Sequence, residues 1–76
     1  MEIDERFKRL GIGLRQARMR QGYAQEHLEY KTGVAQETIS AIENGHNQNP
    51  LLRTIYKLAS FLGIKIDDLL NGHGGH

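Results

Sequence analysis

The chain of 76 residues lacks cysteine altogether, and it has a single proline. Without cysteine, disulfide bonds, thiolate metal sites and thiol catalysis are excluded. No stretch approaches the roughly 18 apolar residues of a membrane span, and the N-terminal MEIDERFKRL is charged where a signal peptide requires an apolar run. These absences predict a soluble, intracellular protein with one small core.

The charges nearly balance overall but are distributed unevenly. Ten Lys and Arg face nine Asp and Glu, which gives a net charge of +1. Residues 6–20 hold six basic side chains and no acidic one, whereas residues 25–44 hold one Lys and four Glu, a local charge of −3. A polyanion-binding protein usually concentrates positive charge where it touches the polymer. The acidic stretch is therefore unusual for a surface that contacts a polyanion.

Apolar residues recur at three- and four-residue spacing along most of the chain, which is typical of amphipathic helices. The pattern predicts helices over 6–21, 24–31, 36–44 and 51–62, and a short final helical turn within 64–70. Pro50 stands where a helix can begin, with Asn49 as its expected N-cap. There is no strand alternation, internal repeat or long heptad run, so the predicted fold class is all-α.

Residues 25–44 have the form of a helix-turn-helix, with Gly33 in a tight turn between two short helices. A helix as short as 36–44 does not persist alone in water, so the flanking helices must hold it. Gly11 and Gly13 lie inside the first predicted helix, where each costs about 1 kcal/mol relative to alanine. We expect them to permit close approach of another helix.

The ordered set of residues resembles the phage repressor and Cro type of helix-turn-helix domain, also called lambda-repressor-like. The resemblance spans roughly residues 10–70. The matching residues are Leu14, Arg15, Arg18, Gly22, Tyr23, Gln25, Leu28, Gly33, Val34, Ile39, Ser40, Ile42, Glu43, Asn44, Gly45, Pro50, Leu58, Ala59, Leu62, Gly63, Ile64, Asp68, Leu69 and Leu70.

The resemblance implies a compact five-helix bundle over residues 1–70, followed by a flexible tail over 71–76. Such domains bind double-stranded DNA, usually as homodimers on palindromic operators, and regulate transcription, here as a repressor. The third helix enters the major groove while the second crosses the DNA backbone. The residues imply no nucleophile–base–orienter set and no roomy pocket, so we expect no enzyme activity, and we expect neither a metal nor a cofactor. We expect a cytoplasmic, nucleoid-associated protein of bacterial or phage origin.

Particular residues take their expected roles from this resemblance. The expected base contacts are Gln36, Glu37, Ser40 and Ala41. The expected phosphate contacts are Gln25, Thr38, Asn44, His46, Arg53 and Arg18. Gln can pair with adenine, Glu can accept from cytosine N4, and an alanine methyl can contact a thymine methyl. Arg18 and Glu43 are expected to form a structural pair between the first and third helices.

The chain also departs from the family pattern. Ala24 and Ala35 stand where Ser or Thr usually caps the second and third helices, which costs about 1 kcal/mol each. Glu29 replaces a small residue where those helices touch, so either its carboxylate reaches solvent or the helices separate slightly. The acidic motif leaves an alternative open, in which the fold is a protein-interaction adaptor or an antitoxin-like partner.

Two further expectations concern metals and dimerisation. The tail histidines His73 and His76, with His46 or His27, invite a metal site, but a glycine-rich tail rarely makes a defined one. Apolar residues near the C-terminus exceed what a short helical turn needs for its own packing, so we expect a homodimer to form there. These residues are Phe61, Ile64, Ile66, Leu69 and Leu70.

Overall fold

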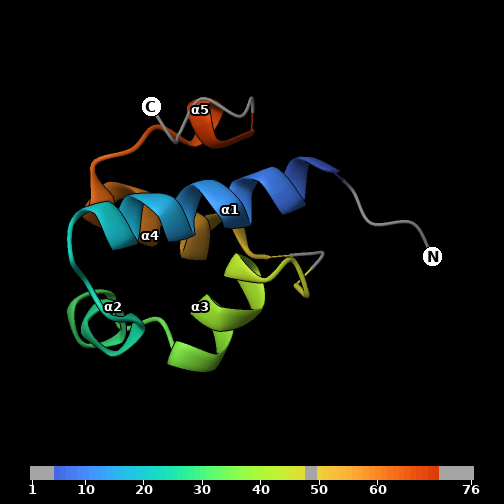
Figure 1. Ribbon diagram of the computed structural model, residues 1–76. Coiled ribbons are helices and arrows are strands. Elements are labelled where there is room, and N and C mark those ends of the chain that lie inside the picture. Colours follow the sequence, from blue (N-terminus) through green and yellow to red (C-terminus); the bar gives the residue numbers. More distant parts are fainter. Residues whose placement is uncertain (1–4, 48–49, 71–76) are drawn as a thin grey trace.

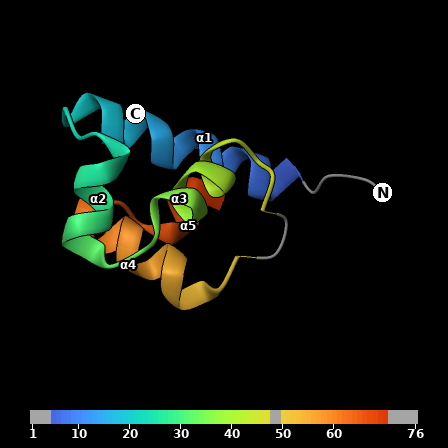
Figure 2. The same cartoon turned by 90° about the horizontal axis from the view of Figure 1, so that it is seen from below.

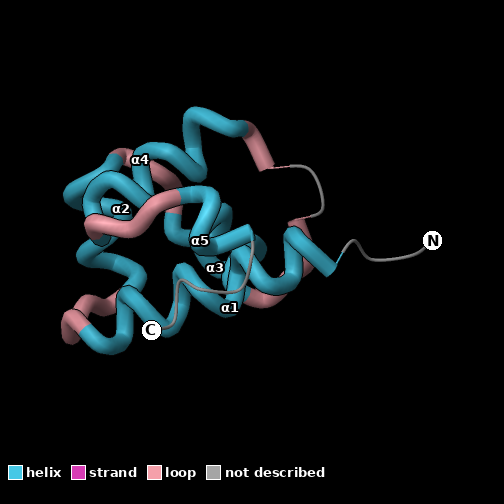
Figure 3. Tube along the Cα trace, turned by 90° about the horizontal axis from the view of Figure 1, so that it is seen from above, coloured by secondary structure: helices cyan, strands magenta, loops and turns pink. Residues whose placement is uncertain are grey.

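Five helices and no strand make up the part of the chain that the computed structural model describes, residues 5–47 and 50–70. They are α1 (Glu5–Arg20), α2 (Gln25–Thr32), α3 (Gln36–Glu43), α4 (Leu52–Leu62) and α5 (Ile66–Leu70), shown in Figure 1 and, by secondary structure, in Figure 3. The all-α, five-helix prediction is confirmed. The predicted tail over 71–76 and its two histidines lie outside the described residues.

The longest helix, α1, contacts α3, α4 and α5. In Figure 1 it runs across the middle of the molecule, with α5 above it and α3 below it. Two glycines make these contacts possible. A Cβ on Gly11 would collide with the backbone carbonyl of Ile42 on α3, and one on Gly13 would lie 2.6 Å from Leu69 Cδ2 on α5. The expected close approach of other helices at the two glycines is confirmed. The contact at Gly11 sets how closely the end of α3 packs against α1.

The turn between α2 and α3 is built by three consecutive residues. Gly33 has φ 79°, in the left-handed region, and its N–H donates to the Glu29 carbonyl at 2.9 Å. The Thr32 hydroxyl donates to the Leu28 carbonyl at 2.6 Å and accepts from the Val34 N–H at 3.2 Å. A glycine adopts this backbone conformation without steric cost, so the chain reverses at once into α3.

Three helices begin without a side-chain cap. Ala24 and Ala35 occupy the N-cap positions of α2 and α3 and form no capping hydrogen bond, as predicted. The predicted start of α4 is wrong, because the helix begins at Leu52 with Leu51 at the N-cap position. Leu51 is extended, with φ −68° and ψ 138°, and its carbonyl accepts the N–H groups of Thr54 and Ile55. Asn49, the expected cap, lies outside the described residues.

One apolar core joins all five helices. Its buried members are Leu10, Leu14, Ala17, Leu28, Val34, Ile39, Ile42, Ile55, Leu58, Ala59, Leu62 and Leu69. Figure 2 shows α3 between α1 and α4, with α2 crossing beside them. Leu69 is fully buried, and Phe61, Ile64, Ile66 and Leu70 pack against the core. The apolar C-terminal residues therefore serve mainly internal packing. No helix of the described ranges has the length and apolarity that crossing a membrane requires.

Candidate nucleic-acid interface

The outward face of α3 borders an open hollow between α2 and α3. Ile39 and Ile42 face the core, each 1% exposed, so the residues between them turn away from it. The hollow has a volume of about 590 Å³ and is called here the recognition hollow. It is lined by Gln25, Glu29, Ala35, Gln36, Glu37, Ser40, Ala41 and His46.

The recognition hollow gathers most of the predicted contact residues. All four predicted base-contact residues line it, and so do Gln25 and His46 from the phosphate set. Thr38 is half-buried and belongs to a different side of α3, since it lies two residues from both Gln36 and Ser40 on a helix of 3.6 residues per turn. Arg53 is exposed on α4, outside the hollow.

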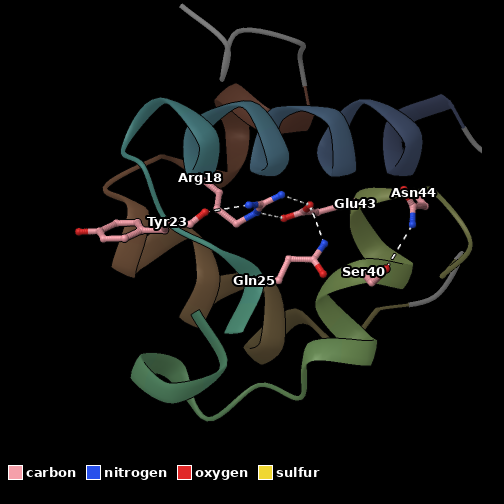
Figure 4. A network of polar contacts seen from close by, with 6 residues as sticks. All are labelled: Arg18, Tyr23, Gln25, Ser40, Glu43 and Asn44. Atoms are coloured by element: carbon pink, nitrogen blue, oxygen red, sulfur yellow. Dashed lines mark hydrogen bonds and ion pairs between the residues drawn. The ribbon is translucent and has the colours of Figure 1, made fainter. Parts of the chain in front are cut away.

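Arg18 and Glu43 form the ion pair that the resemblance implies (Figure 4). Arg18 Nε donates to Glu43 Oε2 at 2.8 Å, and Arg18 Nη2 donates to Glu43 Oε1 at 2.9 Å. A third donor, Nη1, reaches the Tyr23 carbonyl at 2.8 Å. The planar guanidinium thus joins α1 to α3 and also to the connection that enters α2.

This pair lies in a largely desolvated position. The side chain of Glu43 is 2% exposed and that of Arg18 12%. The hydrogen bond to Glu43 raises the pKa of Arg18 above its ordinary value, and charge attraction adds to the rise, while burial opposes it. Arginine is therefore charged throughout the neutral range, and three of its five N–H groups are used within the chain. Only the remaining two are left for a phosphate.

Gln25 also belongs to this network. Its Nε2 donates to Glu43 Oε1 at 3.1 Å, so the amide points toward α3 (Figure 4). An amide nitrogen carries two hydrogens, and one remains for a phosphate oxygen. The sequence does not predict this bond, because the spacing of residues 25 and 43 alone does not place them together.

The end of α3 is tied down by its own hydrogen bonds. Asn44 Nδ2 donates to Ser40 Oγ at 3.3 Å. The backbone N–H groups of Gly45, His46 and Asn47 all donate to carbonyls of α3, that of Ile42 for Gly45 and that of Ala41 for the other two. Any phosphate contact at residues 44–47 must therefore come from side chains such as His46 and Asn44, because the backbone amides of these four residues are occupied.

The recognition hollow carries negative charge. Glu29 is exposed and lines the hollow, which favours the alternative in which its carboxylate reaches solvent over the one in which α2 and α3 separate. Glu37 is the second carboxylate, and the lining contains no lysine or arginine. Positive charge for a DNA backbone must therefore be supplied from outside the hollow.

A model of the Helix-turn-helix family matches residues 14–69. The chain belongs to this family. Its structure is that of a phage repressor/Cro-type helix-turn-helix domain, as the resemblance implied.

Curated relatives carry names consistent with this. The chain is 43% identical over 56 residues to "Uncharacterized HTH-type transcriptional regulator" of Archaeoglobus fulgidus, covering 74% of this chain and 79% of that one. It is 47% identical over 45 residues to "Uncharacterized HTH-type transcriptional regulator MJ0272" of Methanocaldococcus jannaschii, covering 59% and 67%. It is 33% identical over 63 residues to "Uncharacterized HTH-type transcriptional regulator y4dJ" of Sinorhizobium fredii, covering 83% and 80%. No solved structure matches.

These comparisons support a transcriptional regulator. They include two archaeal proteins and one bacterial protein, so they do not favour the bacterial or phage origin expected from the resemblance. The individual contact residues and the dimer stay predictions.

Proposed function

We propose that this protein represses transcription by binding a palindromic DNA operator as a homodimer, each copy reading the major groove with α3. The observation that carries this proposal is the gathering of Gln25, Gln36, Glu37, Ser40 and Ala41 around the recognition hollow. In helix-turn-helix domains this is the side that meets DNA, and two half-sites lie about one helical turn apart. Family membership and the names of the relatives support the same class of function.

The base-reading residues lie along one side of α3. Gln36 and Glu37 begin the helix, and Ser40 and Ala41 follow one turn later. Gln36 supplies a paired donor and acceptor for adenine, Glu37 an acceptor for a cytosine amino group, and Ala41 a methyl for a thymine methyl. Together they define a short half-site that contains cytosine at the position facing Glu37.

The uncapped start of α2 is the proposed main phosphate site. Ala24 provides no side-chain acceptor, so the first N–H groups of α2 stay available for an anion. The remaining amide hydrogen of Gln25 lies beside them. Thr38, Asn44, His46, Arg53 and Arg18 are the further candidates, and Arg18 acts chiefly by holding Glu43.

The exposed face of α4 is the proposed dimer surface. Leu51, Leu52 and Tyr56 are 61%, 72% and 63% exposed there. A shallow groove of about 380 Å³ continues from Tyr56 to Ile64 and Ile66, and Lys65 and Asp67 also line it. An apolar patch that includes one positive and one negative side chain suits a two-fold contact between identical copies, since the lysine of each copy can pair with the aspartate of the other.

A second candidate function is a protein-interaction adaptor. The observation that favours it is the acid lining of the recognition hollow, which has two carboxylates and no lysine or arginine among the residues that form it. A basic side chain from a protein partner would suit this surface better than a phosphate would.

Selection of bound sequences from a random duplex pool tests the first proposal and separates it from the second. A palindromic consensus, bound with an affinity that falls steeply with salt, is expected. Gln36→Ala should remove the preference at one base pair and weaken the consensus by about 1–3 kcal/mol, with the helical circular dichroism unchanged. Enrichment of no sequence, even at low salt, overturns the DNA reading. Retention of a basic protein partner that Glu37→Gln releases would then support the adaptor.

A further inference from the structure

Most of the positive charge of the chain lies on α1, outside the helix-turn-helix motif. Six of the ten lysines and arginines of the chain belong to α1. The hollow itself has no lysine or arginine among its lining residues, and the backbone amides of residues 44–47, which follow α3, are occupied. A DNA phosphate on the α1 side of α3 would therefore have to be neutralised by those lysines and arginines of α1 that point toward α3.

The first turns of α1 lie outside the segment matched by the family. The match begins at residue 14, whereas α1 begins at Glu5. Figures 1 and 2 show these turns beside the connection that leaves α3. Gly11 brings them there, because its missing side chain lets α1 settle on the carbonyl of Ile42. These first turns of α1 thus lie beside the C-terminal end of α3.

Lys8, a basic residue in these first turns, contacts the connection that leaves α3. Its Cγ lies 3.9 Å from the position that a Cβ would take on Gly45, the residue after the C-cap of α3. Lys8 is exposed, so its ammonium group extends from this contact into solvent. His46, which lines the recognition hollow, directly follows Gly45.

Arg15 continues the same side of α1. It lies seven residues after Lys8, which is two helical turns or about 10.5 Å along the axis, and it is also exposed. Arg9, the immediate neighbour of Lys8, turns to the opposite flank, where its Nε donates to the Leu70 carbonyl of α5 at 3.3 Å. Lys8 and Arg15 therefore lie on the α3 side of α1, and Arg9 lies on the α5 side.

We propose that Lys8 and Arg15 form a second phosphate-binding edge, which holds the DNA backbone along the α1 side of the groove that α3 enters. The proposal rests on the proposed DNA-binding function. The contacts are to phosphate only, so they add affinity without sequence preference. The edge supplies the positive charge that the recognition hollow lacks.

Titration of operator and scrambled duplexes at a series of KCl concentrations tests this edge, with Lys8→Gln and Arg15→Gln compared against Arg9→Gln. Arg9→Gln is the matched control, because it removes the same charge from the same turn of α1 on the α5 side. Each of the first two variants should lower affinity near 0.1 M salt by about three- to tenfold, equally for both duplexes, and make the log–log salt slope shallower by about 1. Arg9→Gln should leave the slope unchanged.

The outcomes distinguish the two proposals. If the unaltered protein binds its operator and Lys8→Gln and Arg15→Gln keep its salt slope, the α1 edge is wrong and the DNA-binding proposal stands. A salt slope that becomes equally shallow in all three variants also overturns the proposed phosphate-binding edge, since the loss of one positive charge anywhere on α1 would then explain the change. If the unaltered protein binds no duplex, both proposals are overturned.

Discussion

Gln25 and Glu43 are joined by a hydrogen bond of 3.1 Å between the amide nitrogen and carboxylate oxygen Oε1. The same carboxylate accepts two bonds from Arg18, so three N–H donors from two other helices converge on it. One carboxylate of α3 thereby fixes the start of α2 and the end of α1. The predicted phosphate contact and the orientation of α3 depend on the same group.

Replacing Gln25 should therefore affect binding more than stability. In Gln25→Ala, Glu43 keeps both bonds from Arg18, so the free energy of unfolding should fall by about 1 kcal/mol or less. Operator affinity should fall about tenfold, since a phosphate donor is lost and the start of α2 is less well fixed. Urea unfolding and fluorescence anisotropy measure the two effects. A variant that loses stability but binds normally would contradict the phosphate role.

A double-mutant cycle at Arg18 and Glu43 should reveal strong coupling. Each single change, Arg18→Met or Glu43→Leu, leaves a charge without its partner in a largely desolvated place, which should cost about 3 kcal/mol. The free energy of unfolding that the double variant loses should be smaller than the sum of the two single losses by at least about 1.5 kcal/mol. Additive losses would mean that the pair contributes little.

The pH dependence of this pair follows from the raised pKa of Arg18. A base with a raised folded-state pKa stabilises the fold at all pH values below its unfolded pKa, and the contribution is lost only as pH rises through the folded value. Arginine titrates far above the neutral range. Unfolding measured between neutral and mildly alkaline pH should therefore show no loss of stability from Arg18.

Gly11 should tolerate alanine much less well than Gly13. Alanine is the better helix former by about 1 kcal/mol, so both changes begin with a gain. At Gly11 the new methyl meets the Ile42 backbone and must push α3 away, with an expected net loss of about 1–3 kcal/mol. At Gly13 it meets the end of the Leu69 side chain, which can rotate, so the net change should be smaller. Thermal unfolding of the two variants compares them directly, and equal stabilities would contradict this account.

The sequence predicted elements where local patterns decide the outcome. The apolar stripes of α1 and α4, the glycine turn and both missing caps follow from residue type and spacing within a few positions. The bond from Gln25 to Glu43 did not, since it depends on how two helices meet in space. The predicted start of α4 is also wrong, because a proline is compatible with the first turn of a helix but does not by itself start one. The C-terminal apolar residues pack largely against the core, and the dimer contact that the sequence predicts there stays a prediction.

The two carboxylates of the recognition hollow should differ in their effects on DNA binding. Glu29 lies on α2, the helix expected to cross the DNA backbone, so its charge should act by general repulsion of phosphate. Glu29→Gln should raise affinity for operator and scrambled duplexes alike, by about two- to fivefold at low salt. Glu37→Gln should instead change the preferred base at one position of the half-site. Selection from a random pool with each variant separates them, and an unchanged consensus for Glu37→Gln would remove it from the reading set.

Dimer formation should depend on the outer face of α4. Leu52 and Tyr56 are the most exposed large apolar side chains of that helix and lie one turn apart on it. Because neither is buried in the monomer, Leu52→Asp combined with Tyr56→Asp should leave the unfolding free energy of the monomer within about 1 kcal/mol. Sedimentation equilibrium should then report a dimer for the unaltered protein and a monomer for the variant. Tyr30→Asp is the matched control, because Tyr30 is 82% exposed on α2, away from this face. A dimer that survives the double change but not a change at Ile64 or Ile66 would place the contact at the C-terminal residues, as the sequence first indicated.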